Sequence, residues 1–249
     1  MTVTERKPGS EYSDDYAGVY DAVQYARGRG RASEADLIAE AVRERRPGAS
    51  SVLDVACGTG THMLGLREHF DDVEGLELSE PMRRRALDKV LGSVVHRGDM
   101  RDFRLGRTYD AVTCMCFVIG YTRSADELDQ VLSNMVAHLA PGGVVVIEPW
   151  WFRENAVDHH VAGDVCREAD RVISRLSLSR RVGDRTEMDV RFTIADHGGI
   201  REFTEHESLR LYTRDEYEAA FDRAGLAMRY LPGEPNGRGL FAGVRREER

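Results

Sequence analysis

The chain has 249 residues, of which 41% are hydrophobic, and a formal net charge of -8, so it can bury one large core with a smaller inserted unit. This excess of acidic residues argues against electrostatic binding of nucleic acid, which needs a clustered basic face. No stretch approaches the ~20 apolar residues that span a bilayer, and the N-terminus lacks an apolar signal segment, so we expect a cytoplasmic protein without membrane contact.

The N-terminal arm, residues 1–32, is polar at first and also carries several tyrosines. The polar residues up to about position 16 predict disorder. The tyrosines admit two interpretations: a helix that packs its rings on the domain, or an arm that docks on a ligand. An amphipathic helix is expected over residues 32–46, with Ser33 as its N-cap and Pro47 beyond its end.

Short apolar runs then alternate with helical segments. The runs predict buried strands over residues 51–56, 72–78, 93–98, 109–116 and 142–149. Helical patterns separate them at residues 61–70, 81–90 and 125–140. This alternation is typical of a doubly wound parallel sheet of the α/β class.

The pattern changes after residue 151. Residues 152–212 alternate apolar and polar side chains in several short runs broken by glycines, which predicts an inserted antiparallel β cap. Residues 213–249 begin with a helix between Thr213 and Gly225 and end with two strands that complete the main sheet. We therefore expect four units: the arm (1–32), an α/β domain (33–151), the cap and the C-terminal segment.

A glycine-rich loop, VLDVACGTGTH, follows the first of these strands. Gly58 and Gly60 lie where the chain leaves the strand and enters a helix, and glycine there lets the backbone turn tightly and approach a ligand. A dinucleotide-binding G-x-G-x-x-G would place its third glycine at position 63, which is Met63. A pyrophosphate ligand is therefore disfavoured.

Acidic residues follow the next two strands. Glu77 ends the second strand, where a carboxylate can accept hydrogen bonds from both hydroxyls of an adenosine ribose. Asp99 follows the third strand, where it could accept from an adenine amino group, and Met100 could flank the ring.

Together Asp54, Gly58, Gly60, Glu77 and Asp99 resemble the motifs of class I S-adenosylmethionine (SAM) dependent methyltransferases. That resemblance implies a Rossmann-like sheet of seven strands, the last of them antiparallel. It also implies SAM as the cofactor and S-adenosylhomocysteine (SAH) as its product. We see no metal-ligand spacing, so no metal is expected.

A narrower resemblance, to N,N-dimethyltransferases of nucleotide-linked amino sugars in antibiotic biosynthesis, covers almost the whole chain. The segments that carry it are SSVLDVACGTGTH, GLELS, GDMRDFRLGR, PGGVVVIEPWWF, EYEAAFDRAGL and GRGLFAGV. It implies a substrate in which thymidine diphosphate (TDP) is joined to a deoxyamino sugar, with the amine on C3 or C4, and it leaves a homodimer open. The implied cofactor-binding residues are Tyr20, Arg29, Asp54, Ala56, Gly58, Gly60, Glu77, Asp99, Met100 and Met115.

Arg238, Trp150 and Trp151 are expected to form part of the substrate site. Arg238 lies between glycines, and its forked guanidinium suits a diphosphate. Trp150 and Trp151 leave the fifth strand at its carboxyl edge, where ligands bind in open α/β sheets. We expect one tryptophan to cover the substrate and the other to pack into the cap.

Methyl transfer is an in-line displacement that needs a neutral amine with its lone pair aimed at the sulfonium methyl. Much of the catalysis can be positioning, for which oriented models allow ~7 to 11 kcal/mol. Tyr121 matches a position that in the resembling enzymes lies beside the amine, and Tyr12 matches an N-terminal tyrosine that folds over their site. Glu148 is a third candidate for a catalytic group. A tyrosine near pKa 10 is a poor base, so we interpret these side chains first as orienting groups.

The chain departs from the resembling enzymes at two places. Cys116, Phe117 and Val118 replace a phenylalanine followed by two serines, which predicts a differently shaped sugar pocket. Gly30 and Arg31 replace residues of the lid, although Arg29 can still meet the SAM carboxylate. The alternatives are a methyltransferase of another small molecule and a SAM-binding protein without catalysis.

Overall fold

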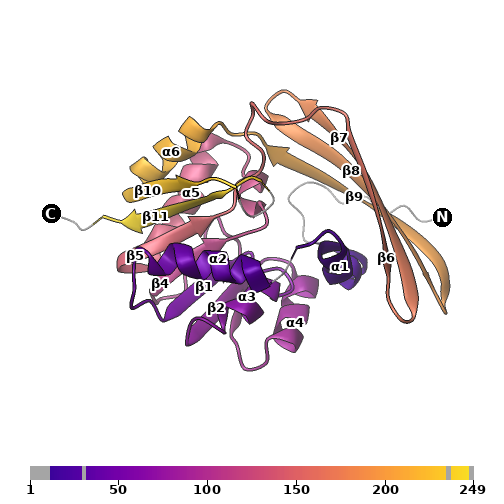
Figure 1. Ribbon diagram of the computed structural model, residues 1–249, viewed down its shortest axis with the longest axis horizontal. Coiled ribbons are helices and arrows are strands. Elements are labelled where there is room, and N and C mark those ends of the chain that lie inside the picture. Colours follow the sequence, from indigo (N-terminus) through magenta and orange to yellow (C-terminus); the bar gives the residue numbers. More distant parts are fainter. Residues whose placement is uncertain (1–11, 30–31, 234–236, 247–249) are drawn as a thin grey trace.

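The computed structural model describes residues 12–29, 32–233 and 237–246, which form two sheets (Figure 1). The larger sheet has the strand order β10-β11-β5-β4-β1-β2-β3. Its strands are β1 Ser51–Val55, β2 Asp72–Glu77, β3 Val95–Arg97, β4 Tyr109–Cys114, β5 Leu139–Ile147, β10 Leu226–Leu231 and β11 Leu240–Arg245. Neighbours from β5 to β3 pair in parallel, whereas β11 is antiparallel to β5 and β10. The predicted seven-stranded α/β sheet is confirmed.

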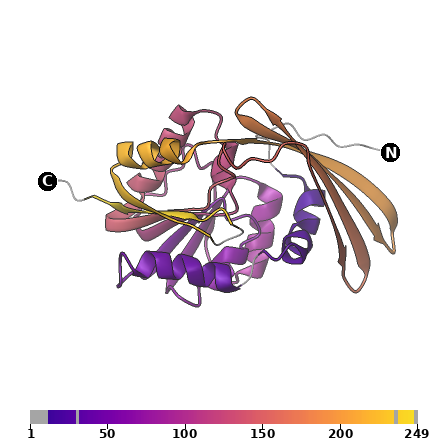
Figure 2. The same cartoon turned by 45° about the horizontal axis from the view of Figure 1, so that its top comes forward.

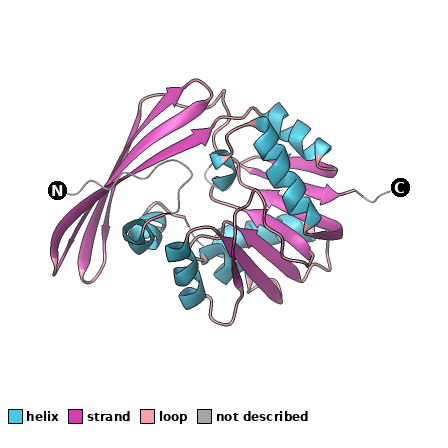
Figure 3. Ribbon diagram, turned by 180° about the vertical axis from the view of Figure 1, so that it is seen from behind, coloured by secondary structure: helices cyan, strands magenta, loops and turns pink. Residues whose placement is uncertain are grey.

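Helices cover both faces of this sheet (Figure 3). The alternation of side chains along β5 explains why: Val144 and Val146 join one buried cluster, and Val145 and Ile147 join the other. The first cluster packs under α2 Ala32–Arg43, α3 Thr61–Leu66 and α4 Glu80–Lys89. The second packs under α5 Ala125–Ala137 and α6 Arg214–Arg223.

The second sheet, called the cap sheet below, contains four antiparallel strands in the order β6-β7-β8-β9. They are β6 His160–Arg167, β7 Arg171–Val182, β8 Arg185–Asp196 and β9 Gly199–Arg210. Three of them have 12 residues each, longer than the short runs expected. The alternation continues through charged residues because one face of the sheet is solvated. The cap sheet lies within the range 152–212, and the division of the chain into four units stays a prediction.

Helix α1, Asp14–Ala26, lies against the inner face of the cap sheet (Figure 2). Its buried residues Tyr16, Val19 and Val23 join cap residues such as Ile173 and Phe192 in a third cluster. The helical interpretation of the tyrosine-bearing segment is therefore confirmed from residue 14 onward. The disorder expected up to about residue 16 is wrong for residues 14–16, which form the first turn of α1, and residues 1–11 lie outside the described part. None of the described helices is long and apolar enough to cross a membrane.

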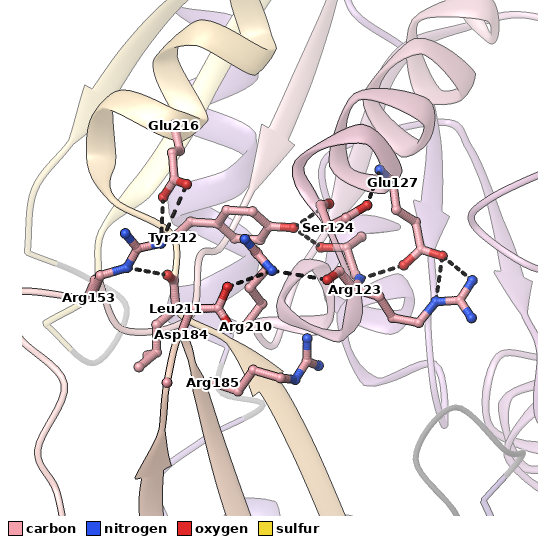
Figure 4. A network of polar contacts seen from close by, with 12 residues as sticks. Arg123, Ser124, Glu127, Arg153, Asp184, Arg185, Arg210, Leu211, Tyr212 and Glu216 are labelled. Atoms are coloured by element: carbon pink, nitrogen blue, oxygen red, sulfur yellow. Dashed lines mark hydrogen bonds and ion pairs between the residues drawn. The ribbon is translucent and has the colours of Figure 1, made fainter.

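A polar network joins the base of the cap sheet to the α/β sheet (Figure 4). The Tyr212 hydroxyl donates to the Ser124 carbonyl at 2.8 Å, and Arg210 donates to the Arg123 carbonyl at 3.1 Å. Arg153 donates to the Leu211 carbonyl at 3.2 Å. In each bond a side chain donates to a backbone carbonyl, so the chain at the end of β9 is tied both to the segment before α5 and to the segment after β5.

Candidate active site

Two adjoining cavities lie between the carboxyl ends of the parallel strands, α1 and the cap sheet. Their volumes are about 430 and 560 Å³, within the size range of ligand pockets. The first reaches the cap sheet and is called the cap cavity; the second follows the glycine loop and is called the loop cavity. Residues that line both are Tyr20, Gln24, Arg29, Ala56, Gly58, Cys116 and Val118.

The two loop glycines have different tasks. Gly58 lines both cavities with φ at +57°. Gly60 lines neither; a Cβ there would lie 3.0 Å from Val90 and 3.1 Å from Ala86, with φ at +79°. Gly58 therefore opens the loop toward a ligand, whereas Gly60 lets the loop pack on α4.

Glu77 lies at the end of β2 in the wall of the cap cavity. Its two carboxylate oxygens accept hydrogen bonds from the backbone N–H groups of Gly58 at 2.9 Å and Ser79 at 2.7 Å. Burial raises the pKa of Glu77, although these backbone bonds oppose the shift. The contacts fix the carboxylate where the sequence predicts a ribose contact.

Asp99 and Met100 line the same end of the cap cavity. Asp99 accepts from the backbone N–H of Arg101 at 3.0 Å and from its Nε at 2.8 Å. Burial alone would raise the pKa of Asp99, but the hydrogen bonds and charge of Arg101 outweigh it and lower the pKa. An ionised acceptor therefore lies next to Met100, as an adenine amino group would require.

Asp54 supplies a buried acceptor in the wall of the loop cavity. Its Oδ1 accepts from Thr113 Oγ1 at 2.7 Å, while its buried Oδ2 has no hydrogen-bond partner within the described ranges. Burying such an oxygen without a partner is costly, and the ammonium group of a bound SAM would satisfy it. Nearby Ala56, also in the wall, has φ at +57°, which is uncommon for a residue other than glycine. The residues present thus fit the cofactor.

Glu148, just beyond β5, is fully buried and lies between two guanidinium groups. Arg29 donates to both of its oxygens, at 2.7 and 2.6 Å, and Arg238 donates at 2.5 Å. Burial alone would raise the pKa of Glu148, but Arg29 and Arg238 outweigh it and hold the pKa below its usual value. Glu148 lines neither cavity, so the geometry supports an anchor for two arginines rather than the catalytic group that the sequence suggested.

Arg29 lines both cavities from the end of the α1 segment. Besides Glu148, its Nε lies 3.2 Å from Glu34 of α2, and it donates to the Cys116 sulfur at 3.2 Å. Held in this way, its guanidinium is fixed near the Asp54 end of the loop cavity. Contact with a SAM carboxylate stays a prediction, and the neighbouring departures at residues 30 and 31 lie outside the described part.

Arg238 lies in the β10–β11 connection, in the wall of the cap cavity. Its guanidinium carbon lies 5.0 Å from the Phe117 ring centroid, 5.5 Å from that of Trp150 and 5.4 Å from that of Trp151. These distances allow cation–π attraction. Its buried Nε has no hydrogen-bond partner in the described residues, so an N–H group is available for a phosphate oxygen.

Both tryptophans line the cap cavity, and one of them is joined to the cap sheet. Trp150 Nε1 donates to Thr186 Oγ1 of β8 at 3.2 Å. The two indole rings are 6.5 Å apart and meet edge to face. Trp150 is therefore the one that packs into the cap, which leaves Trp151 as the candidate for covering a substrate.

Tyr12 and Tyr121 meet across the cap cavity. Their hydroxyl oxygens are 2.7 Å apart, although the residues are far apart in the chain. Burial, and next to it the charge of Glu207, raises the pKa of Tyr121 well above its usual value. Its hydroxyl is consequently neutral at physiological pH and can orient an amine but not act as a strong base.

Sequence reasoning missed the polar inner face of the cap sheet and the contacts that hold α1 in place. Buried Arg175, Ser177 and Glu207 line the cap cavity. On the α1 side, Asp21 accepts from Thr59 of the glycine loop at 2.5 Å. A signal for the cap residues exists, since polar side chains occupy alternate positions of the predicted strands, but it does not reveal which face is buried.

Comparison with known proteins gives matches over nearly the whole chain. A family model described as a methyltransferase domain matches residues 52–143. The dTDP-4-amino-2,3,4,6-tetradeoxy-D-glucose N,N-dimethyltransferase of Saccharopolyspora spinosa is 51% identical over 97% of each chain. The dTDP-3-amino-3,4,6-trideoxy-alpha-D-glucopyranose N,N-dimethyltransferase of Streptomyces venezuelae is 49% identical over 94% of this chain and 99% of its own. SAM-bound CalS10, an amino pentose methyltransferase from Micromonospora echinaspora involved in calicheamicin biosynthesis, has a TM-score of 0.84 at 41% identity, covering 97% of this chain and 100% of its own.

Proposed function

Since this chain belongs to the SAM-dependent N,N-dimethyltransferases of TDP-linked amino sugars, we propose that it adds one or two methyl groups to the amine of a TDP-linked deoxyamino sugar in antibiotic biosynthesis. SAM is its cofactor and SAH the product. The observation that carries the substrate assignment is the cap cavity, which runs from Glu77 and Asp99 to Arg238 and Tyr121. One cavity thus borders both the nucleoside end of the cofactor site and a site for an anionic nucleotide.

The proposed roles follow the two cavities. Bound SAM supplies an electrophilic methyl group on its sulfonium sulfur. Glu77 and Asp99 hold the adenosine end, and Asp54 accepts from the ammonium group. Arg238 binds the diphosphate, with its unmet Nε–H as one donor.

Tyr12 and Tyr121 orient the amine. Their hydroxyl pair can accept a hydrogen bond from the nitrogen and turn its lone pair toward the cofactor site. α1 and the cap sheet limit the access of water. Positioning of this kind accounts for a large share of the rate enhancement.

The test is a mass measurement. We expect the protein incubated with SAM and a panel of 3-amino and 4-amino TDP-sugars to increase the mass of at least one sugar by one or two methyl groups. The two relatives compared above act on a 4-amino and a 3-amino sugar by their names, so the panel also decides the position of the amine. Complete absence of a mass increase across the panel would refute the substrate assignment.

Two other functions remain to be separated from this one. A methyltransferase of a different small molecule would methylate its substrate without TDP, and a SAM-binding protein without catalysis need not bind TDP at all. TDP should therefore raise the melting temperature in the presence of SAH if the proposal is right. The net charge of -8 argues against nucleic acid as a partner. A cytoplasmic, membrane-free location and a homodimer are further proposals, the latter measurable by sedimentation.

A further inference from the structure

Glu207 is a buried carboxylate on the inner face of the cap sheet. Alternation along β9 places Glu205, Glu207 and Leu209 on the same face, and all three are buried. Glu207 pairs in register with Met188 of β8, and both residues line the cap cavity. A carboxylate of the cap sheet therefore borders the space assigned to the substrate.

The position of Glu207 relative to Tyr12 and Tyr121 follows from the contacts of Glu205 and Leu209, its two neighbours on this face. Glu205 accepts a hydrogen bond from Ser13 Oγ at 3.5 Å, and Ser13 directly follows Tyr12. Leu209 lies beside Gly120, where a Cβ would be 3.4 Å from Leu209 Cδ2, and Gly120 directly precedes Tyr121. Glu207 lies between these two contacts on one strand face, so it faces the place where the two hydroxyls meet.

Glu207 differs in its location from the other carboxylates that line the cap cavity. Of the described residues that line it, the carboxylates are Glu77, Asp99 and Glu207. The first two lie at the cofactor end and are held by backbone N–H groups or by Arg101. Among the described lining residues, Glu207 is the one carboxylate in the cap half of this wall.

The groups facing Glu207 come from several elements. The charge of Glu207 acts on Tyr16 of α1, Tyr121 of the 3₁₀ helix Val118–Tyr121 and Arg175 of β7, which also line the cap cavity. Burial first, and then the charge of Glu207, raises the pKa of both Tyr16 and Tyr121. Tyr16 and Tyr121 are thus neutral. A carboxylate beside neutral hydroxyl groups accepts hydrogen bonds and attracts a cationic group.

We propose that Glu207 recognises the amino group of the substrate and selects amino sugars over hydroxyl analogues. This inference rests on the proposed function. In the transfer, the C–S bond breaks, an N–C bond forms, and positive charge leaves the sulfur and appears on the nitrogen. A carboxylate beside the nitrogen stabilises that charge more in the transition state than in the neutral amine.

The experiment compares Glu207→Gln with the wild type by calorimetric titration in the presence of SAH. The titrants are TDP, a TDP-amino sugar that the wild type methylates, and the TDP-sugar with a hydroxyl group in place of the amine. We expect the preference for the amine over the hydroxyl to fall roughly 10- to 100-fold, the range for a lost hydrogen bond to a charged group. Affinity for TDP alone should stay the same, and kcat/KM should fall by a similar factor.

Glu205→Gln is the matched control, because Glu205 has the same charge, face and burial but contacts Ser13. It should keep the preference for the amine. Glu207→Asp keeps the charge on a shorter side chain and should lose only part of the preference, which preserves the test if Glu207→Gln does not fold. An unchanged preference in a folded Glu207 variant overturns the inference, whereas a wild type that methylates no amino sugar overturns the proposed function itself.

Discussion

Replacing Glu148 by glutamine distinguishes an anchor from a base. The substitution keeps the shape of the side chain and removes the charge that Arg29 and Arg238 share. Arg29 keeps Glu34 at 3.2 Å, but Arg238 has no second carboxylate within 4 Å in the described residues. Removing one partner of a buried ion pair costs about 3–5 kcal/mol, because the remaining charge lacks compensation. We expect Glu148→Gln to lower the free energy of unfolding by about that amount.

The pH dependence has a definite sign. The pKa of Glu148 in the folded state is below its usual value, so its ion pairs stabilise the fold fully above the unfolded-state pKa, about 4.3. That stabilisation is lost as the pH falls through the lower folded-state pKa. Urea denaturation between pH 3 and 7 should therefore show a loss of wild-type stability on the acid side that is smaller in Glu148→Gln.

If Glu148 were a general base, its substitution would have different effects on kinetics and stability. Its removal would lower kcat and abolish the acidic limb of the pH–rate profile with little change in stability. The control is Asp129→Asn, which breaks the exposed pair with Arg223 and should lower the free energy of unfolding far less than Glu148→Gln does. If Glu148→Gln unfolds with the wild-type free energy and differs only in kcat, the anchor interpretation is refuted.

Three further substitutions have defined outcomes. Arg238→Lys replaces a fork by a point charge and should raise the KM for the TDP-sugar roughly 10- to 100-fold; steady-state kinetics would contradict the diphosphate role if KM did not change. Gly60→Ala forces a Cβ against Val90 at a positive φ, so denaturation should detect a loss of about 1–3 kcal/mol. Tyr121→Phe should lower kcat less than about 10-fold, which is less than the loss of a general base would lower it. The pH–rate profile should keep its shape, and disappearance of one of its limbs would instead identify Tyr121 as a base.

The grouping of the residues expected to bind the cofactor could be predicted from the sequence because these residues lie at the ends of successive strands. Asp54, Glu77 and Asp99 lie at the carboxyl ends of β1, β2 and β3, and parallel pairing brings these ends to one edge of the sheet. The sequence pattern of each strand and the parallel topology of the sheet therefore predict that these three carboxylates lie close to one another. The place of Arg238 in the wall of the cap cavity could be predicted only because its motif was matched, since nothing local indicates which surface a hairpin arginine faces.

The cap half could not be predicted because it depends on register. A shift of one residue in the pairing of β9 with β8 would turn Glu207 outward and its neighbours inward. The meeting of Tyr12 with Tyr121 likewise depends on how α1 packs between the cap sheet and the α/β sheet. These are long-range outcomes of packing, and neither appears as a local pattern in the sequence.

Glu148 shows why chemical type and location at a strand end are not enough to assign a role. It lies at the same sheet edge as the residues expected to bind the cofactor. It nevertheless belongs to a buried series of alternating acidic and basic side chains that runs from Arg238 through Glu148 and Arg29 to Glu34 and His62. The nitrogen–oxygen distances between neighbouring members are 2.5 to 3.2 Å, so the series tolerates burial that a single ion would not. It connects the helix after the glycine loop with the β10–β11 connection. The guanidinium proposed to bind the diphosphate is therefore held at a fixed place relative to the cofactor loop, which in-line transfer between the two ligands requires.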